Sequence, residues 1–244
     1  YLKTNISHKL KRAESSFAKM QARLKKEANS GKYRLFGDLI MANLYNNDDY
    51  IKSINVYDYE NNKDITITLD ETLTLKENAN KYYKLYNKAK TSVEKLTQLS
   101  SELQLEISSY KQILYSIAAC EKIKELIEIK SEIEPEVVKK EDKKSASMPV
   151  EIEVDGIKIY IGKNNRQNDF IVSKLAKDDD YWFHIKDCAG SHVLLKCDNP
   201  SDKQIFYCAK LAKEYSSAKN SSKAGVIYTK RKYLKKPPKA ALGY

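Results

Sequence analysis

The chain has 244 residues, of which 41% are hydrophobic and 32% charged, and its formal net charge is +11. This balance fits a soluble protein with a core in one large or two modest domains, and no apolar run approaches the ~18 residues of a membrane span. The excess of Lys and Arg favours a polyanionic partner, nucleic acid before membrane, although a solvated lysine-rich surface has the same composition.

Residues 1–30 are expected to form a helix. Apolar residues recur there at spacings of four and three, which is the a/d seam of a coiled coil. Gly31, after Ser30, has the character of a helix stop. A second helix is predicted over 74–131, because Thr74 and Glu77 have the spacing of a capping box and the heptads continue beyond them. At ~1.5 Å per residue these helices would be about 45 Å and about 85 Å long.

Residues 31–73, between the two helices, predict a small tip module. It would hold a short helix over 35–45 and alternating strands over 54–59 and 65–69, joined by a turn at Asn61-Asn62. Residues 1–131 thus predict a long antiparallel coiled-coil hairpin with a small α/β cap at its tip. The longer second helix would lack a partner at its far end, which suggests an N-terminal truncation and leaves heptads exposed through which the fragment would dimerise.

A charged linker is expected over 132–147, followed by a compact α/β domain over 148–244. Its mixed sheet would carry two helices, so the overall class is α+β. Strands are predicted at 151–154, 157–161, 181–185, 192–196, 225–229 and 231–234, and helices at 168–176 and 202–219.

Two polar groupings stand out in this C-terminal domain. One is the run Lys163-Asn164-Asn165-Arg166-Gln167-Asn168, whose amides match base edges or the 2′-OH. In the other, Trp182 and His184 alternate with apolar neighbours on a strand, and His192 is expected close to His184. Stacking on bases would suit Trp182 and His184. The alternative is that Trp182 is a core anchor and the amides cap a loop and a helix, with Asn168 or Asp169 as the N-cap.

The C-terminal tail is basic. The last acidic residue is Glu214, and the Lys and Arg residues after it suit phosphate contacts. The net charge is +6 over residues 1–30, −2 over 31–147 and +7 over 148–244. The candidate RNA-binding residues are therefore Lys163, Asn164, Asn165, Arg166, Gln167, Asn168, Trp182, His184, Ser191, His192, Lys230, Arg231, Lys232, Lys235 and Lys236.

Signals for catalysis are weak. His184 and His192 with Asp187 or Cys188 lack the spacing of a metal motif, and Ser191 beside His192 is not a triad. A metal-dependent nuclease using the acidic run 178–180 stays an alternative. We expect no catalytic residues, no metal and no cofactor. The four Cys residues form no C-x-x-C pair, which favours free thiols and a cytoplasmic protein.

Several strings resemble the NFACT family. In the C-terminal part they are residues 162–169, Asp180-Tyr181-Trp182-Phe183-His184, Gly190-Ser191-His192-Val193 and Lys235-Lys236-Pro237. Upstream they are Tyr33-Arg34, residues 37–40, Asn78-Ala79-Asn80 and residues 82–90. The resemblance covers essentially the whole chain and assigns a coiled-coil middle domain followed by an RNA-binding domain.

This resemblance implies a bacterial ribosome-quality-control factor. Such proteins bind large ribosomal subunits obstructed by peptidyl-tRNA, recruit tRNA and promote alanine tailing of the stalled chain. The tRNA-selecting residues are expected in an N-terminal domain outside this sequence, so the segment would bind rRNA and tRNA without tailing by itself. Members of the family are also named fibronectin-binding proteins, so a surface adhesin that binds fibronectin is the alternative.

Overall fold

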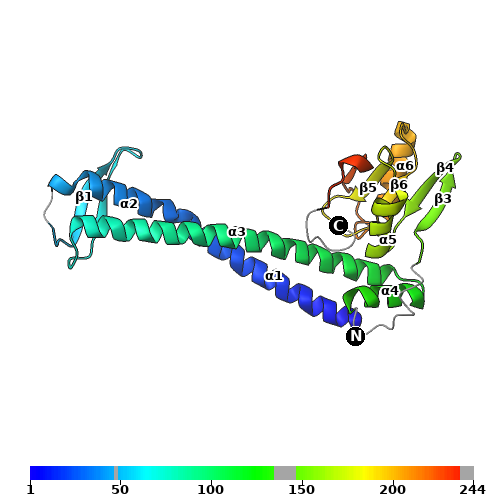
Figure 1. Ribbon diagram of the computed structural model, residues 1–244, viewed down its shortest axis with the longest axis horizontal. Helices are drawn as coiled ribbons and strands as arrows, with labels where there is room; N and C mark the ends of the chain where they lie inside the picture. Colours follow the sequence, from blue (N-terminus) through cyan, green and yellow to red (C-terminus); the bar gives the residue numbers. More distant parts are fainter. Residues whose placement is uncertain (47–48, 135–146, 237–244) are drawn as a thin grey trace. The chain divides into compact units, whose positions relative to one another are not determined.

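The computed structural model describes residues 1–46, 49–134 and 147–236, and the elements are labelled in Figure 1. The chain divides into two compact units, one of residues 15–104 and one of residues 1–14 with 105–244. The described chain combines helices with two sheets, which confirms the α+β class.

Two helices pair antiparallel within the unit 15–104, namely α1 (Leu2–Glu27) and α3 (Leu75–Ala119). Gln21 on α1 donates to the hydroxyl of Ser100 on α3 at 2.7 Å, and Arg23 donates to Ser92 at 3.4 Å. Ser100, a polar position in the apolar seam, is thus buried with a partner from the opposite helix. The predicted coiled-coil hairpin is confirmed.

The predicted helix stop at Gly31 is wrong. A 3₁₀ turn, η1 (Ala28–Ser30), leads directly into α2 (Gly31–Ala42), and Gly31 has a φ of −53°. A glycine ends a helix by taking a positive φ, and here the right-handed backbone simply continues. The chain therefore passes through η1 into α2 without a loop.

The tip module contains the expected hairpin. It follows η2 (Leu44–Asn46) and consists of β1 (Ser53–Asp58) and β2 (Lys63–Thr68), which pair antiparallel with Val56 opposite Ile65. The left-handed conformation needed in the turn is taken by Asn62, with a φ of 49°. The buried core of the tip module joins α2, the hairpin and the start of α3. Its residues are Leu39, Ile40, Ile54, Val56, Ile67, Leu69, Leu75 and Ala79.

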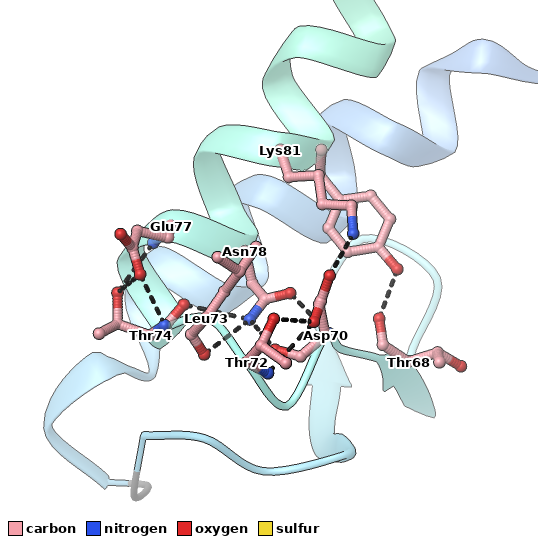
Figure 2. Close-up of polar contacts among 9 residues, drawn as sticks. Thr68, Asp70, Thr72, Leu73, Thr74, Glu77, Asn78 and Lys81 are labelled. Carbon is pink, nitrogen blue, oxygen red and sulfur yellow. Dashed lines mark hydrogen bonds and ion pairs between the residues drawn. The ribbon is translucent and has the colours of Figure 1, made fainter.

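The start of α3 is capped by two sets of hydrogen bonds, which Figure 2 shows together. Glu77 accepts from the backbone N–H of Thr74 at 2.8 Å, and the Thr74 hydroxyl accepts from the N–H of Glu77 at 3.3 Å, so the predicted capping box is confirmed. Asn78 is buried beside it. Its Oδ1 accepts from the N–H of Asp70 at 2.8 Å, and its Nδ2 lies within 3.2 Å of the carbonyls of Asp70, Leu73 and Thr74.

Asn78→Ala is expected to destabilise the tip by about 2 kcal/mol, because it leaves buried backbone groups without their partners. Asn80→Ala is the matched control, since Asn80 is exposed on the same turn of helix and should change stability by less than about 0.5 kcal/mol. Urea unfolding of both variants measures the difference. Equal effects of the two substitutions would show that the Asn78 network contributes nothing.

The second long helix is not continuous, contrary to the prediction. In the unit of residues 1–14 with 105–244, α3 ends at Ala119 and α4 (Ile123–Ile133) follows. Its 45 residues make α3 about 68 Å long, not 85 Å. The carboxylate of Glu125 accepts from the N–H groups of Glu121 and Lys122 at 3.0 and 3.4 Å, which closes the start of α4.

The far end of α3 has a partner within the chain. Ile6 of α1, Ile113 of α3 and Ile129 of α4 form one buried cluster. The chain folds back between Ala119 and Ile123, so α4 covers this end of α3. The unpartnered heptads expected there, and the dimer based on them, therefore lose their support.

The C-terminal domain is built on a five-stranded sheet in the order β3-β4-β6-β5-β7. Every strand pair is antiparallel, so the expected mixed sheet is wrong. The strands are β3 (Val150–Val154), β4 (Ile157–Ile161), β5 (Tyr181–Ile185), β6 (Val193–Leu195) and β7 (Val226–Lys230). Residues 231–233 form a 3₁₀ turn, η5 (Arg231–Tyr233), and not the strand predicted at 231–234.

Two helical segments complete this domain. The first, α5 (Asn165–Phe170), continues into a π-helical turn, η4 (Ile171–Leu175). The second, α6 (Asp202–Glu214), ends five residues before the predicted boundary of 219. It packs Cys208, Leu211 and Ala212 against Phe183 and Val193 of the sheet. Most of the predicted linker, residues 135–146, lies outside the described residues.

Candidate nucleic-acid interface

The polar run 163–168 is folded into the protein. The side chains of Asn164, Asn165, Gln167 and Asn168 are buried, each with 3% exposure or less. Asn164 is the N-cap of α5, accepting from the N–H of Gln167 at 2.9 Å, while Gln167 accepts from the N–H of Lys163 at 2.8 Å. The capping interpretation is therefore right, with Asn164 in place of Asn168 or Asp169. The expectation that these four amides face RNA is not met.

Two of these amides, those of Asn164 and Asn165, contact carboxylates of α4. Glu128, 4% exposed, accepts from Asn164 Nδ2 at 3.3 Å and from the N–H and hydroxyl of Ser147, both at 2.6 Å. Glu132 accepts from Asn165 Nδ2 at 2.8 Å, and its burial raises the pKa of this carboxyl. We call Glu128, Glu132, Ser147, Asn164 and Asn165 the α4 seam. It attaches the C-terminal domain to α4.

The Gly-Ser-His segment makes a second attachment, to α3. The side-chain amide of Gln112 donates to the carbonyl of Gly190 at 2.8 Å and accepts from its N–H at 2.9 Å. The other side of Gly190 faces Ser216, and an added Cβ would lie 2.8 Å from the Ser216 side chain. Only a glycine lets these two segments approach so closely. Ser191, next in the chain, is buried and is not presented on a surface.

Trp182, His184 and His192 form one ring cluster. Trp182 stacks on His184 with centroids 5.8 Å apart, and the two histidine rings are 5.3 Å apart, which confirms their predicted proximity. Burial, aided by the neighbouring His184, lowers the pKa of His192 to about 3, and burial also lowers the pKa of His184. Both imidazoles are thus neutral near pH 7. Because Trp182 is buried too, it is no exposed stacking platform.

The basic tail is partly neutralised within the chain. Lys230 and Lys232 both pair with Asp179, at 3.1 and 2.8 Å, and these lysines lower the pKa of that carboxyl. Lys236 pairs with Asp169 at 2.8 Å, and Arg231 donates to the carbonyl of Val172 at 3.0 Å. Lys235 is exposed. The tail is opposed by acids that precede it by about 50 to 70 residues, and the tail residues 237–244 lie outside the described part.

The remaining candidates stay on the surface or near it. Lys163 pairs with Glu121 at 3.1 Å, and Arg166 is partly exposed. Among the described residues, no group of three or more His, Cys, Asp or Glu side chains is arranged to hold a metal ion. Sequence reasoning missed Gln112, Glu128 and Glu132, whose roles depend on partners more than 30 residues away. The only local signal was a pair of acids on one face of a helix.

Two family descriptions match the chain from end to end. The NFACT N-terminal and middle domains match residues 1–149, and the NFACT protein RNA binding domain matches residues 148–242. The chain belongs to the NFACT family. Its NFACT middle-domain and RNA-binding strings were the basis of the resemblance drawn from the sequence, which is thereby confirmed.

Curated NFACT relatives are named Rqc2 homolog RqcH. The protein from Bacillus subtilis is 33% identical over 98% of this chain, and that from Streptococcus suis is 31% identical over 98%. A Streptococcus pneumoniae relative is 29% identical over the full chain. The aligned part is 44 to 46% of each relative, so the chain spans less than half the length of these proteins.

A solved NFACT-like structure has the same fold. It is the C-terminal part of the fibronectin/fibrinogen-binding protein from Streptococcus suis, with a TM-score of 0.74 and 26% identity. The similarity covers 100% of this chain and 87% of that one. Within residues 1–46, 49–134 and 147–236, none of the helices combines the length and apolarity needed to cross a bilayer.

Proposed function

We propose that this NFACT segment binds the large ribosomal subunit as the RNA-gripping part of a ribosome-quality-control factor. The observation that carries the proposal is the match of residues 148–242 to the family's RNA-binding domain. The relatives' name, Rqc2 homolog RqcH, supports it. The charge supports it as well, since a net +11 attracts the phosphates of rRNA.

In the finer form of this proposal, the subunit is one obstructed by peptidyl-tRNA, and the whole protein recruits tRNA for alanine tailing. The segment itself would act in the cytoplasm by binding, without catalysis, metal or cofactor. The buried state of the 163–168 amides moves the proposed contacts away from base reading. The proposed contacts are instead made by exposed cations such as Lys235. Binding would therefore depend on the RNA phosphates and little on the base sequence of the RNA.

Binding to purified large subunits is expected to weaken steeply with salt. If four phosphates are contacted, tripling the KCl concentration should lower the affinity roughly 20- to 50-fold through counterion release. Replacing Lys232, Lys235 and Lys236 by Ala should lower affinity about tenfold and flatten the salt dependence. Lys158→Ala is the control, since Lys158 is an exposed cation of the same domain, paired with Glu151. A salt-independent affinity would contradict the proposal.

Fibronectin binding is the second candidate, because the solved neighbour is a fibronectin/fibrinogen-binding protein. That role would need a pool of the protein at the cell surface. Cell fractionation followed by binding of the surface pool to immobilised fibronectin tests it. Finding the protein with ribosomes alone would leave the RNA-binding proposal as the better one.

A further inference from the structure

A basic hollow lies in the unit 15–104, where α1 gives way to α2. Its volume is about 560 Å³, and Arg23, Lys26 and Lys32 line it together with Glu27, Tyr33 and Ala89. We call this space the basic hollow. Three cations and one carboxylate line it, so the hollow is basic.

The hollow follows from the local backbone. The 3₁₀ turn η1 carries the chain from the last turns of α1 into α2, so that Lys32 and the α1 residues Arg23 and Lys26 line the same space. Across from them, α3 contributes Ala89, which is 8% exposed. A small side chain at this position leaves room that a longer one would fill.

The carboxylate that lines the hollow is already paired. Glu27 is engaged by Arg23, with Nε and Oε1 3.5 Å apart, and Arg23 also donates to Ser92 at 3.4 Å. Lys32 lies over the Tyr33 ring, with Nζ 5.3 Å from the centroid, and Tyr33 stacks on Tyr82. A cation held by a ring face keeps its N–H donors free for a further partner.

Two lysines that line the hollow have ammonium groups available for a ligand. Among the residues that the structure describes, Lys26 and Lys32 have no ion pair within 4.0 Å, and both are exposed. Like charges gathered around one hollow repel, and a bound anion relieves that repulsion. The planar guanidinium of Arg23 beside two ammonium groups is a donor set that suits phosphate oxygens.

We propose that the basic hollow binds a backbone phosphate of RNA, with Lys26 and Lys32 as the principal contacts. This inference rests on the proposed function and gives it a specific site in the coiled-coil middle domain. RNA is favoured over a free phosphate because the hollow is open to solvent and α1 carries further exposed cations, including Lys19 and Lys25. A continuous polyanion gains from all of them, whereas a free ion gains only from the hollow.

The test compares two double variants in binding to purified large subunits over a range of KCl concentrations. Lys26→Ala with Lys32→Ala should lower affinity about tenfold and reduce the log–log salt slope by about 1.5, because two phosphate contacts are lost. The control is Lys63→Ala with Lys76→Ala, which removes two exposed lysines of the same unit that neither line the hollow nor belong to α1. It should lower affinity about twofold or less. Unchanged melting curves establish that both variants are folded.

The outcomes separate this inference from the proposed function. Salt-dependent binding by the wild type, with equal losses in both variants, overturns the basic hollow and leaves the function standing. No binding by the wild type overturns both. Inorganic phosphate at matched ionic strength provides the second arm. It should compete no better than chloride, and selective competition that the hollow variant abolishes would assign the site to free phosphate and overturn the RNA proposal.

Discussion

The C-terminal domain is expected to lose up to about 5 kcal/mol of stability as the pH falls from about 6.5 to about 3. The cause is His192, whose pKa is lowered to about 3 by burial and by the neighbouring His184. Between these pH values His192 is protonated in the unfolded chain and neutral in the folded domain, so acid favours unfolding. Each unit of pKa difference corresponds to about 1.4 kcal/mol.

The sign is fixed by the direction of the shift. A histidine held neutral in the fold contributes nothing above its unfolded pKa and opposes folding increasingly below it. His184 acts in the same direction, since burial lowers its pKa as well. Trp182 is the only tryptophan and its ring centroid lies 5.1 Å from that of His192. Its fluorescence therefore reports unfolding of the region around His192.

His192→Gln is the informative variant, because it removes the titrating ring while keeping the backbone N–H that donates to Asn168 at 3.0 Å. Urea unfolding at pH 7, 5.5 and 4 should show a clearly smaller loss of stability with acid than in the wild type. His8→Gln is the control, since His8 is exposed on α1. An unchanged pH dependence in the His192 variant would show that the buried imidazole is not responsible.

Glu128→Ala is expected to detach the C-terminal domain from α4 at a cost of about 2 to 4 kcal/mol. The substitution leaves the buried amide of Asn164 and both donors of Ser147 without their acceptor. Unsatisfied buried polar groups cost about 1–3 kcal/mol each, and partial access of water reduces the sum. Hydrogen exchange of the amides of residues 163–168 should accelerate, because the α4 seam no longer covers them.

Glu121→Ala is the matched control for this variant. Glu121 also carries a carboxylate between α3 and α4 and pairs with Lys163 of the same polar run, but its side chain is 74% exposed. An exposed ion pair contributes about 0–1 kcal/mol, so exchange over 163–168 should hardly change. If the two variants behave alike, the docking of the domain does not depend on the buried acid.

The local features of the fold could be predicted from neighbouring residues. The heptads of α1 and α3, the capping box at Thr74 and the alternation in β1 and β2 depend on neighbours within a few residues. Such features reflect backbone geometry and short-range hydrogen bonds, which the sequence carries directly. The family could be identified for the same reason, because its strings are contiguous.

Which polar residues are available to a partner depends on contacts between distant parts of the chain. The side-chain amides of Asn164 and Asn165 donate to Glu128 and Glu132, over 30 residues earlier, because α4 folds back at Cys120. The tail lysines that look unopposed in sequence find Asp179 and Asp169 across the fold. The basic hollow exists because η1 lets residues of α1 and α2 line one space beside Ala89. Pairing and burial of charge are set by distances in space, and separation along the chain carries no information about them.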